Sequence, residues 1–456
     1  MKFSWRVPGL VASVLIGGQA VSAIDLDLNS TDSIKQAAST AAYGLVKWYT
    51  GNNTGDVPGN LPAPYFWWEA GAMFGSLVDY WYYTGDDSYN EITTQALLFQ
   101  TGPNDDYMPP NQTKTEGNDD QGFWAMAAMT AAEDNYPNPP SDKPQWLALA
   151  QAVFNTQATR WDDTTCGGGL RWQIFTFNNG YNYKNTISNG CFFNVAARLA
   201  RYTGNQTYAD WAEKIFDWVS ALQLMDENYH FYDGSDDTIN CTQVNHIQWT
   251  YNAGVYMQGA AAMWNLTQSD TWKQRVLGII NGTSVFFQDG VMYEVACEPN
   301  GKCDNDQRSF KAYLSRAMAA TAKVAPFTFD LIMPLLQSSA QAAAQQCSGT
   351  AGPYGSFGNV CGLRWTQKQQ YDGSFGPGEQ MAAMEIFQSN LVTKVQGPVT
   401  NKTGGTSKGN PNAGSNSGTS PIVYSTISTS DRAGAGIITT LVLIGILGGA
   451  LWMASA

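Results

Sequence analysis

The feature that most constrains the fold is an internal repeat in the middle of the chain. In three places a Gly is followed thirteen residues later by Thr and eighteen residues later by an aromatic residue: Gly71, Thr84 and Tyr89; Gly190, Thr203 and Tyr208; Gly254, Thr267 and Trp272. A fourth, less regular copy opens at residues 119–122, Asp-Asp-Gln-Gly. Such self-similarity is the signature of an architecture built from one repeated unit.

Each copy predicts a helix, a short turn and a second helix. The first helix is apolar on nearly all sides, which is typical of a buried helix. The second has apolar residues at helical spacing with charges between them, which is typical of an outer helix. Helices are predicted near residues 33–49, 66–83, 88–101, 120–134, 143–159, 189–203, 207–222, 251–265, 270–284, 308–323, 327–345 and 378–394. This series predicts an all-α fold, an (α/α)6 toroid of six inner and six outer helices. The long loops before several inner helices would gather at one mouth.

The two ends of the chain predict export and anchoring. Lys2 and Arg6 precede an apolar run, and small residues at 21–23 fit a cleavage site, so residues 1–23 are interpreted as a signal peptide. An uncleaved membrane anchor is the alternative, but the run is short for a span. Residues 24–398 form the predicted catalytic domain, and residues 399–432 form a Ser, Thr, Gly and Asn-rich stalk that we expect to stay extended.

The apolar residues 433–456 complete the pattern of a signal for a glycosylphosphatidylinositol (GPI) anchor, which is removed on maturation. A transmembrane anchor is the alternative, although no Lys or Arg follows the apolar stretch. The attachment residue stays open between small triplets such as residues 428–430 and 414–416. The predicted location is the cell surface, at the plasma membrane or in the cell wall.

Composition narrows the function classes. The net charge of −13 argues against a nucleic-acid partner, which requires a basic surface. With two histidines and no Cys-x-x-Cys pair, no metal or other cofactor is predicted. Short loops favour disulfides Cys297–Cys303 and Cys347–Cys361, and the odd total of seven leaves at least one thiol unpaired. N-glycosylation sequons, which are typical of an exported glycoprotein, begin at Asn29, Asn52, Asn111, Asn205, Asn240, Asn265, Asn281 and Asn401.

The candidate catalytic pair is Asp119 and Asp120, at the start of the second inner helix. Adjacent side chains inside a helix diverge by about 100°, so two neighbouring carboxylates converge on one bond only where a helix begins. A helix N-terminus favours a charged carboxylate, whereas burial against aromatics such as Trp124 favours the protonated form. Glycoside cleavage requires two carboxyls in such opposed states. The alternative is purely structural: Asp119 as an N-cap and Asp120 as a first-turn carboxylate.

The starts of the other inner helices predict the rest of the site. Trp68 and Glu69, Asn189, and Asn252 occupy equivalent positions, so polar and aromatic groups would ring one mouth and contact a sugar. Glu69 would be a substrate-binding third carboxylate or a structural one. Three rival acidic pairs are interpreted as solvated turns or loops: residues 105–106, 162–163 and 236–237.

The sequence around the pair resembles glycoside hydrolase family 76. The resemblance rests on three stretches: residues 108–124 (MPPNQTKTEGNDDQGFW), 168–173 (GGLRWQ) and 185–190 (NTISNG). It covers roughly residues 30–395 and implies an (α/α)6 barrel that cleaves α-1,6-linked mannan and acts in fungal cell-wall assembly. It also implies a retaining mechanism with Asp119 as nucleophile and Asp120 as general acid/base. Trp124, Trp172 and Asn189 are then expected to contact the substrate.

Alternatives remain open from the sequence. The same covalent intermediate serves a transglycosylase that passes a GPI-glycan mannoside to wall β-glucan, and no single residue decides between water and sugar as the acceptor. A non-catalytic mannan-binding wall protein is a third possibility. A terpene-type cyclase also uses an α/α toroid, but it fits poorly with eight sequons and a GPI signal.

Overall fold

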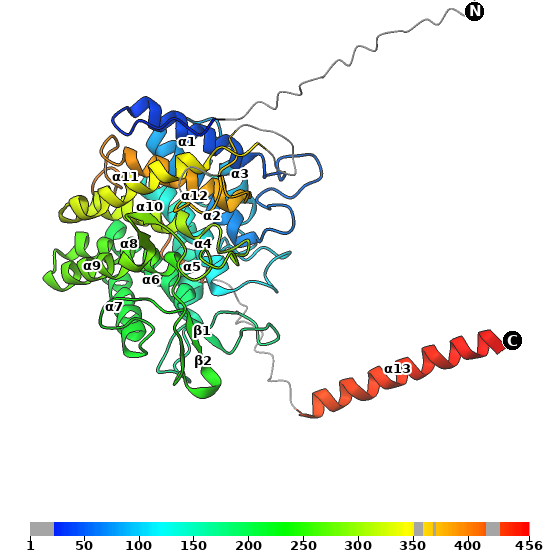
Figure 1. Cartoon of the computed structure of the whole chain (residues 1–456). Helices are drawn as coiled ribbons and strands as arrows, with labels where there is room; N and C mark the ends of the chain where they lie inside the picture. The colour runs from blue at the N-terminus through cyan, green and yellow to red at the C-terminus, as the bar shows by residue number, and fades with distance from the viewer. Residues whose placement is uncertain (1–21, 351–358, 368–370, 416–428, 456) are drawn as a thin grey trace, which may run out of the picture.

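The computed structural model describes residues 22–350, 359–367, 371–415 and 429–455, so residues 1–21 of the predicted signal peptide and 416–428 of the predicted stalk lie outside it. Six inner helices form a closed ring, in which each contacts the next and the last returns to the first (Figure 1). They are α2 (Trp67–Thr84), α4 (Asn118–Glu133), α6 (Thr186–Thr203), α8 (Thr250–Thr267), α10 (Phe310–Val324) and α12 (Pro377–Gln388).

Each inner helix packs mainly against one outer helix, which is the next helix along the chain for the first five inner helices, and the first outer helix pairs with the last inner one. The outer helices are α1 (Thr31–Val46), α3 (Asn90–Phe99), α5 (Trp146–Thr159), α7 (Gln206–Ala221), α9 (Asp270–Gly282) and α11 (Phe329–Gln346). This arrangement confirms the predicted (α/α)6 toroid.

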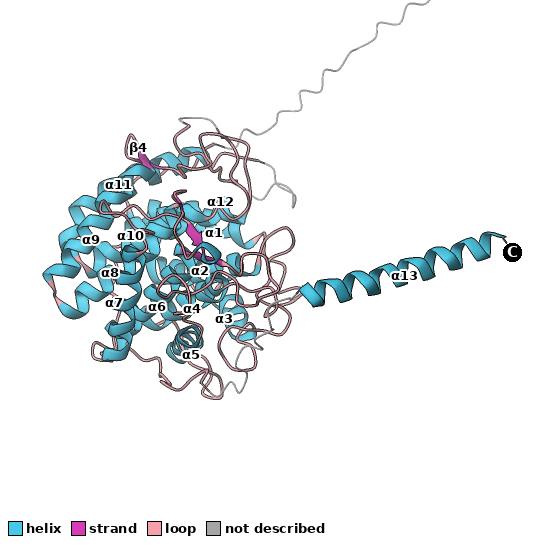
Figure 2. Ribbon diagram, turned by 90° about the horizontal axis from the view of Figure 1, so that it is seen from below, coloured by secondary structure: helices cyan, strands magenta, loops and turns pink. Residues whose placement is uncertain are grey.

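Short strands lie between the helices of the ring and are drawn in magenta in Figure 2. An antiparallel sheet of order β1-β2-β3 pairs Tyr183–Asn185, Gly234–Asp236 and Val244–Asn245, and β4 (Phe287–Gln288) pairs with β5 (Val291–Met292). The 3-10 turns are Asp237–Ile239, Thr283–Phe286, Pro326–Thr328 and Ser389–Leu391. The sequence patterns did not predict the three-stranded sheet, and its strand β1 leads directly into α6 and the site described below.

The repeated Thr closes each inner helix. Thr84, Thr203 and Thr267 are the last residues of α2, α6 and α8, and each hydroxyl donates to the carbonyl four residues earlier at 2.6–2.7 Å. The next residue takes a left-handed conformation, and the amide after it donates back to the Thr hydroxyl. The repeat is therefore a helix-stop and turn signal.

The repeated Gly lets neighbouring inner helices approach closely. A Cβ on Gly71 would lie 2.6 Å from the Trp124 ring of α4, and one on Gly190 would lie 2.7 Å from Val255 of α8. Gly122, in the irregular copy, meets Cys191 of α6 at 2.5 Å in the same way. Side chains at these positions would push the ring apart, because protein interiors have no room for an extra methyl group.

Three disulfides form within the described residues. Cys297–Cys303 and Cys347–Cys361 confirm the predicted pairs. The third joins Cys166 to Cys241, 75 residues apart, which spacing alone did not indicate. Cys191 is the free thiol, buried on α6.

Residues 399–415, here called the strap, lie on the barrel, whereas their composition predicted an extended stalk. The Val399 amide donates to the Glu133 carbonyl at 2.7 Å, and the Asn155 side-chain amide donates to the Pro411 and Ala413 carbonyls. Ser407 is buried, and its hydroxyl accepts from the Leu147 amide in the first turn of α5 at 3.0 Å. Side chains of the barrel thus satisfy the polar backbone of the strap, so the segment is ordered without an apolar core of its own.

Beyond the strap, α13 spans Thr429–Ser455. Among the described residues, no single helix is both long and apolar enough to cross a membrane, and α10 and α11 meet that test only together, as a pair bent by 120°.

The strap makes a first prediction. Ser407→Ala is expected to lower the free energy of unfolding by about 1 kcal/mol, because it removes a helix cap that the strap supplies to α5. The measurement is urea unfolding followed by circular dichroism. Ser415→Ala is the matched control, since among the described residues the Ser415 hydroxyl bonds only to the Asn412 carbonyl within the strap. Equal stability of the two variants would contradict the capping role.

Candidate active site

A cavity of about 180 Å³ opens at the N-terminal ends of the inner helices. Its lining comes from α2, α4, α8 and α10 and from the loops and strand between them. The lining residues are Trp68, Asp119, Asp120, Phe123, Trp172, Tyr183, Asn185, Asp233, Tyr251, Asp306 and Phe310. Tyr251 and Phe310 stack face to face, with ring centroids 3.9 Å apart. Flat aromatic faces and carboxyl groups therefore share one hollow, as a sugar site requires.

The two catalytic candidates lie in the first turn of α4. The helix begins at Asn118, two residues earlier than predicted, and Gly117 rather than Asp119 is the N-cap. Asp120 Oδ2 accepts from the Gly117 amide at 2.6 Å, so Asp120 has a capping role in addition to lining the cavity. A Cβ on Gly117 would lie 2.3 Å from Asp119 Oδ1, so only Gly leaves room for that carboxyl.

Burial shifts the ionisation of both carboxyls. Burial, and then repulsion from Asp120, raises the pKa of Asp119 well above its ordinary value. Burial raises the pKa of Asp120 to about 7, and the nearby Asp306 carboxyl adds to this. Because adjacent carboxyls titrate as a pair, the consequence is shared: near neutral pH the two groups together keep one proton.

Hydrogen-bond donors decide where that proton resides. Asp119 accepts from the Asp120 amide at 3.1 Å and from the Asn185 side-chain amide at 3.5 Å. Asp120 accepts only from Gly117 among the described residues, which leaves its Oδ1 without a donor. Donors stabilise the ionised form, so these contacts favour the negative charge on Asp119 and the proton on Asp120, whereas burial and the neighbouring Asp120 charge favour the neutral form of Asp119.

Two further carboxyls line the cavity that the sequence patterns did not single out. Asp233 accepts from the Tyr183 hydroxyl at 2.6 Å and from the Trp249 indole at 2.9 Å. Asp306 accepts from the Trp68 indole at 3.1 Å, and burial raises its pKa to about 6. Neither belongs to a repeated motif or to an acidic pair, so no local signal marked them. Asn185 lay inside the stretch that carried the family resemblance, but its role emerges only from its contact with Asp119.

The structure brings only part of the predicted substrate-binding set into the cavity. Trp68 and Trp172 line it. The other four lie outside the lining, which differs from the direct sugar contact predicted for them: Glu69, Trp124, Asn189 and Asn252.

These four residues are buried in the barrel. Trp124 stacks on Trp67 with centroids 5.1 Å apart, and Asn189 bonds to the Leu170 amide and carbonyl at 2.8 and 3.0 Å. Asn252 and Glu69 are buried without hydrogen-bond partners among the described residues. Burial, and then repulsion from Asp306 and Glu379, raises the pKa of Glu69 well above its ordinary value, which favours its neutral form.

The rival acidic pairs are not simply solvated, as had been expected. One member of each is exposed and the other has little contact with solvent: Asp105 and Asp106, Asp163 and Asp162, Asp236 and Asp237. Asp162 and Asp237 both pair with Arg171, so their role is structural. Among the described residues, no group of three or more His, Cys, Asp or Glu side chains is arranged to hold a metal ion.

Comparison with known proteins agrees with the geometry. The family model described as glycosyl hydrolase family 76 matches residues 33–402. Mannan endo-1,6-alpha-mannosidase DCW1 of Candida glabrata is 48% identical, with 99% of this chain and 100% of that protein covered. The protein of the same name from Saccharomyces cerevisiae is 47% identical, with 98% and 99% covered.

A solved structure of Dfg5 from Chaetomium thermophilum in complex with glucosamine is 49% identical to this chain. It superposes with a TM-score of 0.81 and covers 86% of this chain and 98% of its own. The resemblance deduced from the Asp119-Asp120 region is thereby confirmed. The chain is a glycosidase that belongs to glycosyl hydrolase family 76.

Proposed function

We propose that this enzyme cleaves α-1,6-mannosidic bonds within mannan, in the assembly of a fungal cell wall. The observation that carries the proposal is the buried Asp119-Asp120 pair at a helix N-terminus, in a cavity lined by Trp68 and Trp172. The Candida and Saccharomyces relatives, which are named as mannan endo-1,6-alpha-mannosidases, support the choice of bond.

In the proposed mechanism the anomeric configuration is retained. Asp119, as the carboxylate, attacks the anomeric carbon while Asp120 gives its proton to the departing glycosidic oxygen. The bond from the sugar to the leaving group breaks, and a mannosyl ester forms on Asp119. Asp120, now ionised, takes a proton from a water molecule that attacks the same carbon and releases Asp119.

The test is the activity of the purified domain on α-1,6-mannan, with release of reducing ends as the readout. Proton NMR of the first product gives its anomeric form, and α-product is expected for retention. Inversion would overturn the double displacement and leave the glycosidase proposal standing. Tight mannan binding by the wild type without cleavage would instead support the non-catalytic wall protein.

The pKa shifts predict how activity depends on pH. The general acid works only while protonated, and burial raises the pKa of Asp120 to about 7. We therefore expect kcat/KM to fall about tenfold per pH unit above pH 7, where Asp120 loses its proton, and to fall along an acid limb at low pH, where Asp119 becomes protonated. An aspartic acid with an unperturbed pKa would lose its proton near pH 4, and activity would then fall above that pH. Initial rates between pH 4 and 9 check this, and an alkaline limb near pH 4 would contradict the proton assignment.

Transfer to a sugar acceptor is the second candidate function. The cavity presents four carboxyls (Asp119, Asp120, Asp233 and Asp306) and no Lys or Arg among its lining residues. Such a site favours a cationic amino sugar, and the Chaetomium relative holds glucosamine. A GPI glycan contains a glucosamine next to its mannosides, which supports it as the donor, with wall β-glucan as the acceptor.

Product analysis separates hydrolysis from transfer. The enzyme is given a GPI-glycan mannoside donor with and without a β-glucan oligosaccharide, and products are identified by mass spectrometry. A mannosyl-glucan product supports transfer. Exclusive hydrolysis at every acceptor concentration would rule it out.

We also propose that the enzyme is exported and held at the cell surface by a GPI anchor. Three disulfides support an oxidising compartment. Seven of the eight sequon asparagines are exposed, whereas Asn265 is half-buried, with its amide bonded to Arg201 and the Val324 carbonyl. Release of the protein by phosphatidylinositol-specific phospholipase C is expected, and retention after treatment would point to a transmembrane anchor.

A further inference from the structure

One wall of the cavity, here called the wall, is formed by residues 171–172 and strand β1 (Tyr183–Asn185). Both segments place alternate side chains toward the cavity. Trp172 lines the cavity and its neighbour Arg171 does not. In strand β1, Tyr183 and Asn185 line the cavity and Lys184 between them does not. This is the alternation of an extended chain, in which successive side chains point to opposite faces. The back of the wall therefore consists of Arg171 and Lys184.

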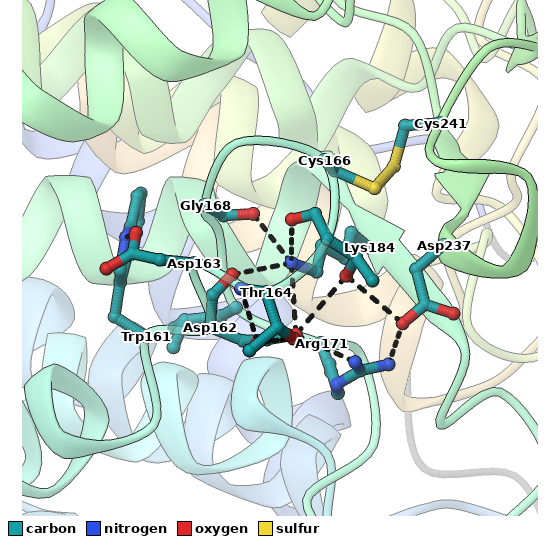
Figure 3. A network of polar contacts seen from close by, with 12 residues as sticks. Trp161, Asp162, Asp163, Thr164, Cys166, Gly168, Arg171, Lys184, Asp237 and Cys241 are labelled. Atoms are coloured by element: carbon teal, nitrogen blue, oxygen red, sulfur yellow. Dashed lines mark hydrogen bonds and ion pairs between the residues drawn. A yellow bond between two sulfur atoms is a disulfide. The ribbon is translucent and has the colours of Figure 1, made fainter.

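Behind the wall these two cations form a cluster with two carboxylates, here called the wall cluster: Asp162, Arg171, Lys184 and Asp237 (Figure 3). Arg171 pairs with Asp162 at 2.7 Å and with Asp237 through its other terminal nitrogen. Lys184 lies 3.3 Å from Asp162. Although burial opposes it, hydrogen bonds from Thr164 and the charges of Lys184 and Arg171 lower the pKa of Asp162 to about 2. Asp162 thus remains ionised across the working pH range.

Lys184 is the central element of the wall cluster. Its side chain is fully buried, and its ammonium donates to the carbonyls of Asp162, Thr165 and Gly168 at 2.7–2.8 Å. All three donors of the ammonium are thereby used. One side chain therefore ties the loop of residues 162–168 to the strand that carries Tyr183 and Asn185.

The disulfide Cys166–Cys241 fastens the same loop to the segment between β2 and β3 (Figure 3). The Cys166 amide also donates to the Asn240 side chain at 2.6 Å, and the Trp218 indole donates to the Cys166 carbonyl at 3.0 Å. The loop is consequently a fixed base, held from two directions, against which Lys184 positions the wall.

The wall in turn contacts the catalytic turn of α4. The Arg171 carbonyl accepts from the Asn118 side chain, and the Trp172 carbonyl accepts from the Asn118 amide, both at 2.8 Å. From the neighbouring strand, Asn185 donates to Asp119. A continuous set of contacts thus runs from the wall cluster to the candidate nucleophile.

We propose that Lys184 and Arg171 are positioning residues, which hold Asn185 against Asp119 and Trp172 against the bound sugar. The inference rests on the proposed function, because it assigns the wall a part in that reaction. Lys184 touches no substrate and acts through Asn185, and Arg171 acts through Trp172 and the start of α4.

The test is Lys184→Met, which keeps the length of the side chain and removes its three hydrogen bonds. A displacement of about 1 Å at a catalytic group can cost about 100-fold in rate, so a fall in kcat/KM of about 10- to 100-fold is expected. The acid limb of the pH profile is expected to move to higher pH, because Asp119 loses a donor that favours its ionised form. The other titratable groups around Asp119 stay in place: Asp120, Tyr183, Cys191, Asp233, Tyr251 and Asp306.

Arg198→Met is the matched control. Arg198 is a buried cation on α6, the helix that Asn185 caps, and it pairs with Glu133 at the opposite end of the barrel. Both variants are expected to lose stability, but only Lys184→Met should shift the acid limb. If the two variants leave the pH profile equally unchanged while the wild type cleaves mannan, the positioning role is wrong. A wild type without activity would instead overturn the proposed function.

A double-variant measurement distinguishes positioning from general damage. If Lys184 acts through Asn185, Lys184→Met should shift the acid limb in the wild type and leave it unchanged in an Asn185→Ala background. Additive shifts in the two backgrounds would contradict the route through Asn185. Arg171→Lys should restore part of the activity that Arg171→Met loses, since one ion pair survives.

Discussion

Asp119→Asn is expected to lower kcat on α-1,6-mannan by at least about 10³-fold, and Asp120→Asn by about 10²–10⁴-fold. The first variant removes the nucleophile, and the second removes the proton donor for the leaving oxygen. Both asparagines keep the volume of the native side chain, so the cavity is preserved. The measurement is steady-state kinetics with circular dichroism as a check of folding.

The two roles can be told apart with an aryl mannoside that has a good leaving group. The leaving group of such a substrate needs little protonation, so the rate of the first step should largely recover in Asp120→Asn. Asp119→Asn should stay inactive. The alkaline limb near pH 7 should also disappear in Asp120→Asn, because its cause is the Asp120 proton. Equal inactivity of both variants on this substrate would contradict the assignment of roles.

Arg198→Met is expected to lower the free energy of unfolding by about 3–5 kcal/mol. The Arg198 guanidinium donates to Glu133 at 2.8 Å and to Thr130 at 2.8 Å, at the C-terminal ends of α4 and α6. Removing it leaves the buried Glu133 carboxylate with one longer ion pair among the described residues, to Arg201 at 3.4 Å. A buried charge that loses its nearest partner is the costly product of breaking such a pair. Chemical unfolding of the two proteins measures the difference.

Two further variants sharpen that result. Glu213→Gln breaks the exposed pair with Arg275 and should cost at most about 1 kcal/mol. Adding Glu133→Gln to Arg198→Met should recover part of the loss, because the remaining charge is then removed. A double variant less stable than Arg198→Met alone would show that lost packing, rather than the orphaned charge, sets the cost.

Features that repeat along the chain were predictable from the sequence. In the repeat, the Gly marks a close contact between neighbouring inner helices, the Thr marks the end of an inner helix, and the aromatic residue marks a packed outer helix. These features recur at fixed offsets because each helix pair is the same structural unit. The predicted helices accordingly match the observed ones to within a few residues at most ends, although α12 ends earlier, at Gln388. The position of the candidate pair, Asp119 and Asp120, in the first turn of an inner helix was predictable for the same reason.

Sequence patterns were less informative where a residue's position depends on distant partners. Trp124, Asn189 and Asn252 occupy the repeat positions expected of substrate contacts, yet the structure buries them outside the cavity lining. The strap was assigned to a stalk because its composition cannot form a core, but barrel side chains satisfy its backbone. The composition of a segment does not indicate whether another part of the protein can bind it.

The sequence by itself therefore determined the toroid, the closed ring of six inner helices, two of the three disulfides and the carboxyl pair, because each leaves a short-range pattern. Only the tertiary structure decided which groups surround that pair. Asn185, Asp233 and Asp306 lie 65 to 187 residues from Asp119–Asp120 along the chain and meet it in one cavity. No periodicity in the sequence predicts that these residues lie together. Their proximity results from the packing of the helices and from loops held by buried ion pairs such as those of Arg171 and Lys184.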